Sequence, residues 1–170
     1  MVQRRVSGWG LRCKLTMMLC IMLIPPSRTD MRRYFCEVYA RWRSGQPLDA
    51  MDALLSAWMR EHPEYDAVFA QPDVAIDGES QSDHAGHANP FLHLSMHLAL
   101  SEQSSIDSPR GIRQALDVLA ARLDSLHAAH HAAIDCLQDM IATSQLRGEP
   151  LDGEGYLLCV QRKVLMKNKD

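Results

Sequence analysis

The stretch from Gln46 to Val160 contains no lysine and only five arginines, against eighteen acidic residues. Nucleic-acid-binding proteins need clustered Lys and Arg to neutralise phosphates, so this acidic body argues against nucleic acid as a partner. Aromatic residues are also scarce, at 6% of the 170 residues, while alanine, leucine and methionine are plentiful. That composition favours helices over strands.

No long hydrophobic run is present. The apolar run at residues 15–24 covers ten residues, whereas a transmembrane helix needs about 20, so we expect no membrane partner. Basic residues precede this run as in a signal peptide, but no small-residue cleavage site follows it. Two interpretations stay open: translation begins at Met22 and the protein is cytoplasmic, or the run directs export. In both, we expect residues 1–21 to lie outside the fold and residues 166–170 to form a basic tail.

Cysteines occur five times, at scattered positions and without a Cys-x-x-Cys pair. This pattern fits neither a zinc ribbon nor a disulfide framework. Cys136 and Cys159 fall on apolar helical faces, so we expect them to be small core residues in a reducing cytoplasm.

Common catalytic motifs are missing as well. The sequence has no Gly-x-Ser-x-Gly, no Walker loop and no dinucleotide fingerprint. The zinc-protease pattern His-Glu-x-x-His is absent, and no Glu stands three residues before a paired histidine, as di-iron carboxylate bundles require. Enzyme activity is therefore unsupported.

Apolar residues recur at helical spacing throughout, and no stretch alternates as a strand does. We predict an all-α, single-domain bundle of five or six helices within residues 22–165, with an extra turn at Glu64–Phe69 and a long loop at 71–88. The loop carries His84 and His87, which we expect to be solvated. The predicted helix starts are Thr29 or Asp30, Asp49, Asn89-Pro90, Ser108-Pro109, Ser125 and Asp152.

Two pairs of histidines stand out within these helices, His93 with His97 and His127 with His131. Residues i and i+4 share one helix face, so each pair offers two imidazoles to a common point. Asp135 lies one turn beyond His131 and is a candidate fifth ligand or a group that orients an imidazole. Two such helices packed together would close a site for zinc or iron.

Other histidines have simpler interpretations. His130 points near the core face of its helix and is expected to be a hydrogen-bonded core residue. His62 precedes Pro63 at a helix end and is expected to cap it, and Glu64 is not expected to contribute to a metal site.

Several segments together resemble a known family of small bacterial proteins, catalogued only as domain of unknown function 1841. The resemblance runs from about Pro26 to Val160, and its most specific block is Asn89-Pro-Phe-Leu-His-Leu-Ser-Met-His-Leu-Ala. The family implies no activity, substrate or cofactor. It does imply histidines at the four paired positions and a Glu where Asp135 stands, and it supports Met22 as the start.

Three interpretations follow. The first is an uncharacterised helical protein that holds a transition metal through His93, His97, His127 and His131, with Asp135 nearby. The second is a non-catalytic interaction module without metal, whose protein partner the sequence does not name. The third is a metal-dependent hydrolase or oxygenase, which would need an open coordination position and a nearby base. If the imidazole nitrogens of the two pairs lie close to one common point, the metal-binding interpretation is favoured over the module without metal.

Overall fold

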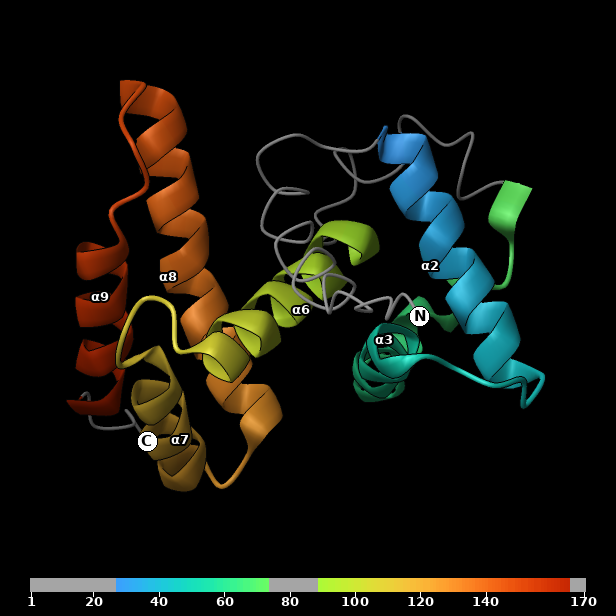
Figure 1. Ribbon diagram of the computed structural model, residues 1–170, viewed down its shortest axis with the longest axis horizontal. Helices are drawn as coiled ribbons and strands as arrows, with labels where there is room; N and C mark the ends of the chain where they lie inside the picture. The colour runs from blue at the N-terminus through green and yellow to red at the C-terminus, as the bar shows by residue number, and fades with distance from the viewer. Residues whose placement is uncertain (1–26, 74–88, 166–170) are drawn as a thin grey trace, which may run out of the picture.

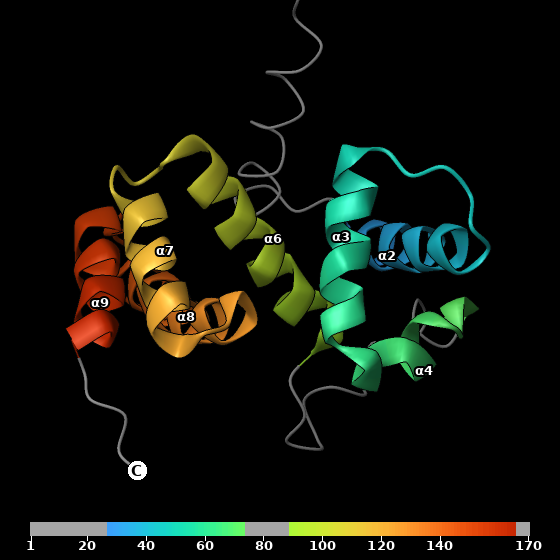
Figure 2. The same cartoon turned by 90° about the horizontal axis from the view of Figure 1, so that it is seen from below.

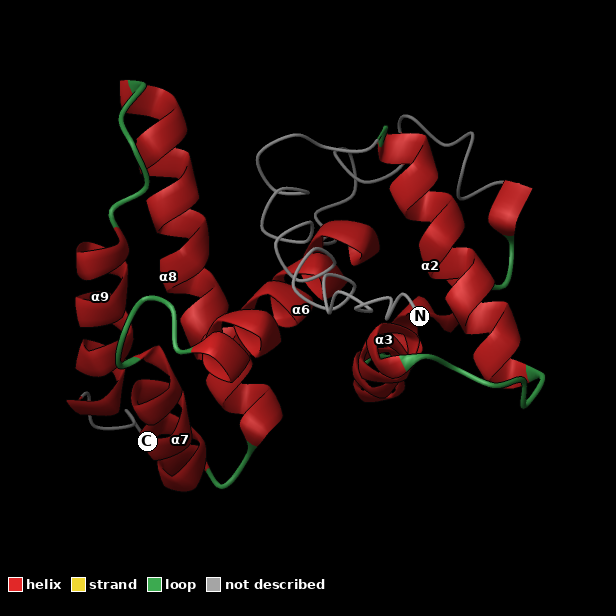
Figure 3. Cartoon of the chain, viewed as in Figure 1, coloured by secondary structure: helices red, strands yellow, loops and turns green. Residues whose placement is uncertain are grey.

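The computed structural model describes residues 27–73 and 89–165, and every regular element in these ranges is helical (Figure 3). They are α2 (Arg28–Arg43), α3 (Ala50–Glu61), the 3-10 helix η1 (Pro63–Tyr65), α4 (Asp66–Phe69), α6 (Pro90–Ile106), α7 (Ile112–Leu123), α8 (Leu126–Arg147) and α9 (Gly153–Leu165). The all-α prediction is confirmed. The predicted number of five or six helices is too low, because the extra turn predicted at Glu64–Phe69 is itself a short α-helix, α4, preceded by η1. None of the described helices is long and apolar enough to span a bilayer.

Local capping chemistry sets most of the helix starts. Side chains accept hydrogen bonds from first-turn backbone N–H groups at four predicted caps, which are Asp49, Asn89, Ser125 and Asp152. The first helix is instead capped by Ser27, whose hydroxyl accepts from Asp30 N–H at 3.1 Å. The start predicted at Ser108-Pro109 is wrong by three residues. Asp107 Oδ1 accepts from Gly111 N–H at 2.9 Å, which holds this segment as a turn before α7 begins.

Two hydrophobic cores flank α6, which lies between α2–α4 and α7–α9 in both views of the chain (Figures 1 and 2). Phe91, Leu94 and Leu98 of α6 pack into the core shared with α2, α3 and α4. Met96 and Leu100, on another face of the same helix, pack into the core shared with α7, α8 and α9. The helix is therefore buried on most sides, and the described helices are organised around α6 rather than around one common centre.

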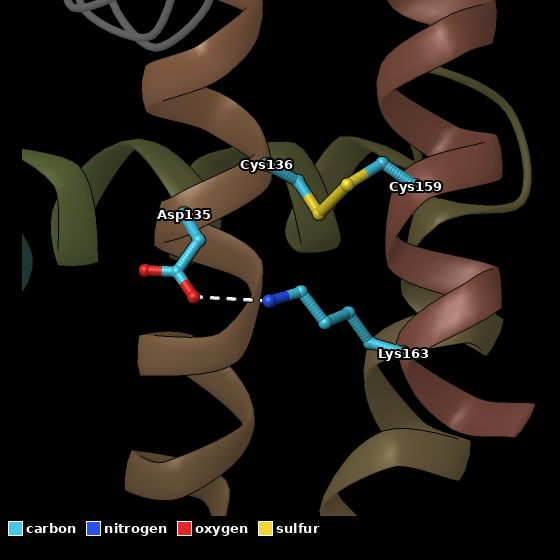
Figure 4. Close-up of a disulfide and its surroundings, with 4 residues drawn as sticks. All are labelled: Asp135, Cys136, Cys159 and Lys163. Atoms are coloured by element: carbon cyan, nitrogen blue, oxygen red, sulfur yellow. Dashed lines mark hydrogen bonds and ion pairs between the residues drawn. A yellow bond between two sulfur atoms is a disulfide. The ribbon is translucent and has the colours of Figure 1, made fainter. Parts of the chain in front are cut away.

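A disulfide joins α8 to α9 within the second core (Figure 4). Cys136 and Cys159 are 23 residues apart in sequence, and their Cα atoms lie 5.9 Å apart. The expectation that both are unpaired core thiols is wrong. They do face apolar surroundings, but the packing of α8 against α9 brings the two sulfur atoms into bonding distance. The spacing of the cysteines in the sequence does not indicate how these helices pack. Cys36 is a buried free thiol, as its apolar position suggests.

Candidate metal centre

Two histidines of α6, His93 and His97, lie where the two hydrophobic cores meet. His93 and His97 lie one turn apart, between the face of α6 that enters the first core and the face that enters the second. His97 is fully buried, whereas His93 is half-buried. The Nε2 atoms of the two rings are 3.2 Å apart. The i, i+4 spacing therefore brings both imidazoles to one point, as the sequence pattern predicts.

The second pair enters from α8, which packs across α6 (Figure 1). The His131 ring centroid lies 4.9 Å from that of His93 and 5.1 Å from that of His97. His127 lies 4.3 Å from His131, centroid to centroid. His131 is exposed and His127 half-buried, so the α8 side of the cluster meets solvent. All four histidines of the predicted pairs thus gather at one place.

A fifth ring comes from an unexpected position, His62 at the end of α3. The residue before a proline is driven out of the helical region, and His62 has φ −126° and ψ 61°. The ring is 2% exposed and turned inward. Its Nε2 lies 3.0 Å from Nε2 of His97 and 3.0 Å from Nε2 of His127. The expectation that His62 merely caps the helix is wrong, because this turn places its ring in the centre of the cluster.

Glu64 fixes the orientation of His62. The His62 Nδ1–H group donates to Glu64 Oε1 at 2.8 Å, which assigns the ring proton to Nδ1 and leaves the Nε2 lone pair facing the cluster. Burial alone would raise the pKa of Glu64, but the hydrogen bond from His62, a backbone hydrogen bond and the neighbouring His62 and His93 together lower it. A carboxylate that holds the outer nitrogen of an imidazole is a common arrangement around bound metals. Glu64, set aside on sequence grounds, therefore belongs to the site.

One group of nitrogen donors has the spacing that a metal needs. Each of four residues offers a ligand atom, and these atoms all lie within 4.8 Å of one another; the residues are His62, His93, His97 and His131. His127 adjoins this group through its 3.0 Å approach to His62. Donors around a zinc ion at 2.0–2.1 Å are separated by about 3–4 Å, so small ring movements would suffice to surround a cation.

Hydrogen bonding alone does not explain these contacts. A neutral imidazole nitrogen carries either one N–H or one lone pair in the ring plane. His62 Nε2 faces two other Nε2 atoms, and His97 Nε2 also faces two, those of His62 and His93. One proton or one lone pair serves one partner fully, so at most two of the three contacts can be complete hydrogen bonds. A cation at the centre would accept a lone pair from each of these nitrogens at once.

Electrostatics keep four of the rings neutral, those of His93, His97, His127 and His131. Burial, followed by the neighbouring His62 and His131, lowers the pKa of His93 to about 4. Burial and the adjacent imidazoles, His130 first, lower the pKa of His97 to about 2. The pKa values of His127 and His131 are also lowered, chiefly by burial. The uncharged ring is the form that ligates metal, so protons do not compete for these nitrogens at pH 7.

Trp58 of α3 forms one wall of the cluster. Its ring stacks on His97 at 4.3 Å and lies 4.4 Å from His130, centroid to centroid. The indole N–H donates to Ser101 Oγ at 3.0 Å, which fixes the ring. His130 is 3% exposed, and its Nδ1 lies 3.4 Å from His97 Nδ1. His130 thus contacts the outer edge of His97 and packs in the core, as expected, rather than facing the shared centre.

Asp135 is turned away from the cluster. Its carboxylate forms an ion pair with Lys163 Nζ of α9 at 3.0 Å (Figure 4). The Asp135 side chain is exposed and that of Lys163 is half-buried. Helical spacing places it one turn beyond His131, but α9 supplies a cation on the other side. The structure therefore brings the four paired histidines together and leaves Asp135 apart from them. His84 and His87 lie outside the described residues.

Comparison with known families agrees with this chain's motifs. Residues 27–162 match the model of a family described as Domain of unknown function (DUF1841). The chain belongs to this family. The match takes in all six residues of the centre, which are His62, Glu64, His93, His97, His127 and His131. No curated protein and no solved structure matches the chain.

Proposed function

We propose that this DUF1841 protein binds a transition-metal ion at the junction of its two cores. The nitrogen ligands are His62, His93, His97 and His131, and Glu64 holds His62 in place. One observation carries the proposal: each of these four histidines, which come from three separate helical segments, offers a ligand atom within 4.8 Å of those of the other three. Imidazole donors suit zinc, iron, copper and nickel, so zinc or iron remains the expected occupant.

Burial supports a ligand role over a packing role. A packed core gains most from apolar side chains, whereas each buried imidazole needs a hydrogen-bond partner. Here buried His62 and His97 point nitrogens at other nitrogens, with only Glu64 as an oxygen partner among the contacts of these two side chains. Metal coordination would give each of these nitrogens a partner of its own. In the interaction module without metal, the same nitrogens have to share protons and lone pairs among themselves.

The position of the site suggests what the ion would do. His62 comes from the half of the chain that forms the first core, and His131 from the half that forms the second. His93 and His97 come from α6, which contributes to both. A bound ion would tie the ends of α3 and α8 to α6, in addition to the apolar contacts. The protein is then a metal-binding helical module, and its two halves are held together in part by coordination bonds.

Metal content tests this proposal directly. The full chain, stripped with chelator and then incubated with zinc or iron(II), is dialysed and analysed by plasma mass spectrometry. We expect close to one ion per chain. The variant His93→Ala/His131→Ala removes two ligands at half-buried and exposed positions, so it should stay folded by circular dichroism and lose the ion.

Asp135→Asn is the matched control, because Asp135 lies on α8 near His131 but pairs with Lys163. It should retain metal as wild type does. A folded wild-type protein that takes up neither ion would contradict the proposal. Equal loss in Asp135→Asn and in the histidine variant would instead make Asp135 part of the site.

A further inference from the structure

Three of the rings form a nearly equilateral triangle. The centroid distances are 4.9 Å from His62 to His97, 5.4 Å from His62 to His131 and 5.1 Å from His97 to His131. The three rings come from the end of α3, from α6 and from α8. Rings whose centroids are spaced this evenly can each turn one nitrogen toward a single ion that lies between them.

The other two rings cap this triangle. His93 lies 4.6, 4.8 and 4.9 Å from His62, His97 and His131, centroid to centroid. His127 lies 4.6, 5.6 and 4.3 Å from the same three rings. Each cap contacts all three members of the triangle, yet among the ring contacts of the described residues His93 and His127 do not contact each other. The two caps are therefore on opposite sides of it.

A triangle with one donor on each side is a trigonal bipyramid. At metal–nitrogen distances of about 2.1 Å, neighbouring donors lie about 3.4 Å apart in a tetrahedron, but an axial and an equatorial donor lie about 3.0 Å apart. The observed distances between cap and triangle are 3.0 Å for His127 to His62 and 3.2 Å for His93 to His97. These two distances are close to the axial–equatorial value. Within the triangle, His62 Nε2 and His97 Nε2 lie 3.0 Å apart, whereas two equatorial donors lie about 3.6 Å apart, so these two rings would separate slightly around a bound ion.

A second carboxylate stands behind the fifth ring. Glu61 Oε2 lies 4.0 Å from His127 Nδ1, on the side opposite the nitrogen that approaches His62. This repeats the relation between Glu64 and His62 at longer range. A carboxylate near Nδ1 favours the proton on that atom and leaves Nε2 free to bind. Charge and geometry thus both direct the lone pair of His127 toward the centre.

We infer that His127 is a fifth ligand and that it sets the coordination number, and so the metal preference, of the site. This inference rests on the proposed function. Structural zinc sites are almost always four-coordinate and tetrahedral, whereas five imidazoles suit a divalent first-row ion that accepts a larger donor set. The favoured ions are of the iron(II), cobalt(II), nickel(II) and copper(II) class. Without His127 the four remaining histidines would make a site suited to zinc.

Cobalt(II) reports coordination number through its visible absorption, which is intense in tetrahedral sites and several-fold weaker in five-coordinate ones. The stripped full chain is titrated with cobalt(II), and bound metal is quantified beside the spectrum. We expect a weak five-coordinate spectrum in the wild type. In His127→Ala we expect the intense tetrahedral one, and a shift of relative affinity from cobalt toward zinc in competition. Asp135→Asn should keep the wild-type spectrum.

The outcomes are distinct. Failure of cobalt to bind to the folded wild type overturns the proposed function itself. Bound cobalt with a tetrahedral spectrum in the wild type overturns five-coordination and leaves metal binding intact. A spectrum that His127→Ala does not change overturns the ligand role of His127, whatever the coordination number. Should His127→Ala fail to fold, His127→Gln replaces it, and its cobalt spectrum is compared with that of the wild type to test the ligand role of His127 in the same way.

Discussion

Acidification should destabilise the metal-free protein, and His130 allows the size of the effect to be worked out. His130 is 3% exposed, and burial, followed by nearby His127 and His131, lowers its pKa to about 4 from 6.5. Between these two values the unfolded chain binds a proton that the folded protein does not. Stability is therefore fully present above pH 6.5 and is lost as the pH falls toward 4. From pH 7 to pH 4.5 this residue alone removes roughly 2 kcal/mol.

Urea unfolding of chelator-treated protein at pH 7 and pH 4.5, followed by circular dichroism, measures this loss. The variant His130→Gln cannot titrate, so its free energy of unfolding should fall by roughly 2 kcal/mol less than that of wild type over the interval. His131→Gln is the matched control: its ring is exposed, so the difference from wild type should be smaller. If His130→Gln and wild type lose equal stability between the two pH values, the conclusion that His130 stays neutral in the folded protein is refuted.

Three further predictions concern the carboxylate, the ion and the disulfide. Glu64→Gln should weaken zinc or cobalt binding about 10–100-fold, because His62 loses the partner that orients it; titration calorimetry measures this, and unchanged affinity would contradict the role of Glu64. Zinc or cobalt at a hundred times its Kd should stabilise the fold by about 2.7 kcal/mol, or roughly 5–10 °C in Tm by scanning calorimetry, and the rise should be absent from His93→Ala/His131→Ala. Cys136→Ser should lower the free energy of unfolding by roughly 3 kcal/mol for a 23-residue separation, and reductant should lower it similarly in wild type but not in the variant.

Much of the helical framework follows from local chemistry and can be predicted from the sequence. The caps Asp49, Asn89, Ser125 and Asp152 work through hydrogen bonds within the first turn of their helices, so spacing along the chain is enough. The paired histidines of α6 and α8 are predictable for the same reason, because i, i+4 geometry is a property of one helix. That the two pairs meet is a matter of packing, which periodicity does not determine.

The errors at the candidate site and at the cysteines share one physical cause: each depends on how separate helices cross. His62 has the sequence of a helix end, and only the passage of that end over α6 brings its ring to His97. A usable sign was present in His62-Pro-Glu64, where a proline turns the chain and a carboxylate stands two residues away. Asp135 has helical spacing suited to a ligand, but α9 provides Lys163 on its other side. Pairing of the cysteines depends on the register of α8 against α9 in the same way.

The location of the histidines also bears on why they are tolerated in the fold. Neutral imidazoles lose solvation on burial and return little without a partner, so five of them at one point weaken the metal-free protein relative to an apolar junction. The proposed ion would bind only when the ends of α3 and α8 both meet α6, and its binding free energy would offset that loss. Because the donors come from both halves, this energy acts on the arrangement of the two cores and not on either core alone. Metal removal should therefore loosen the junction before it unfolds the helices, and hydrogen exchange should show the ends of α3 and α8 losing protection first.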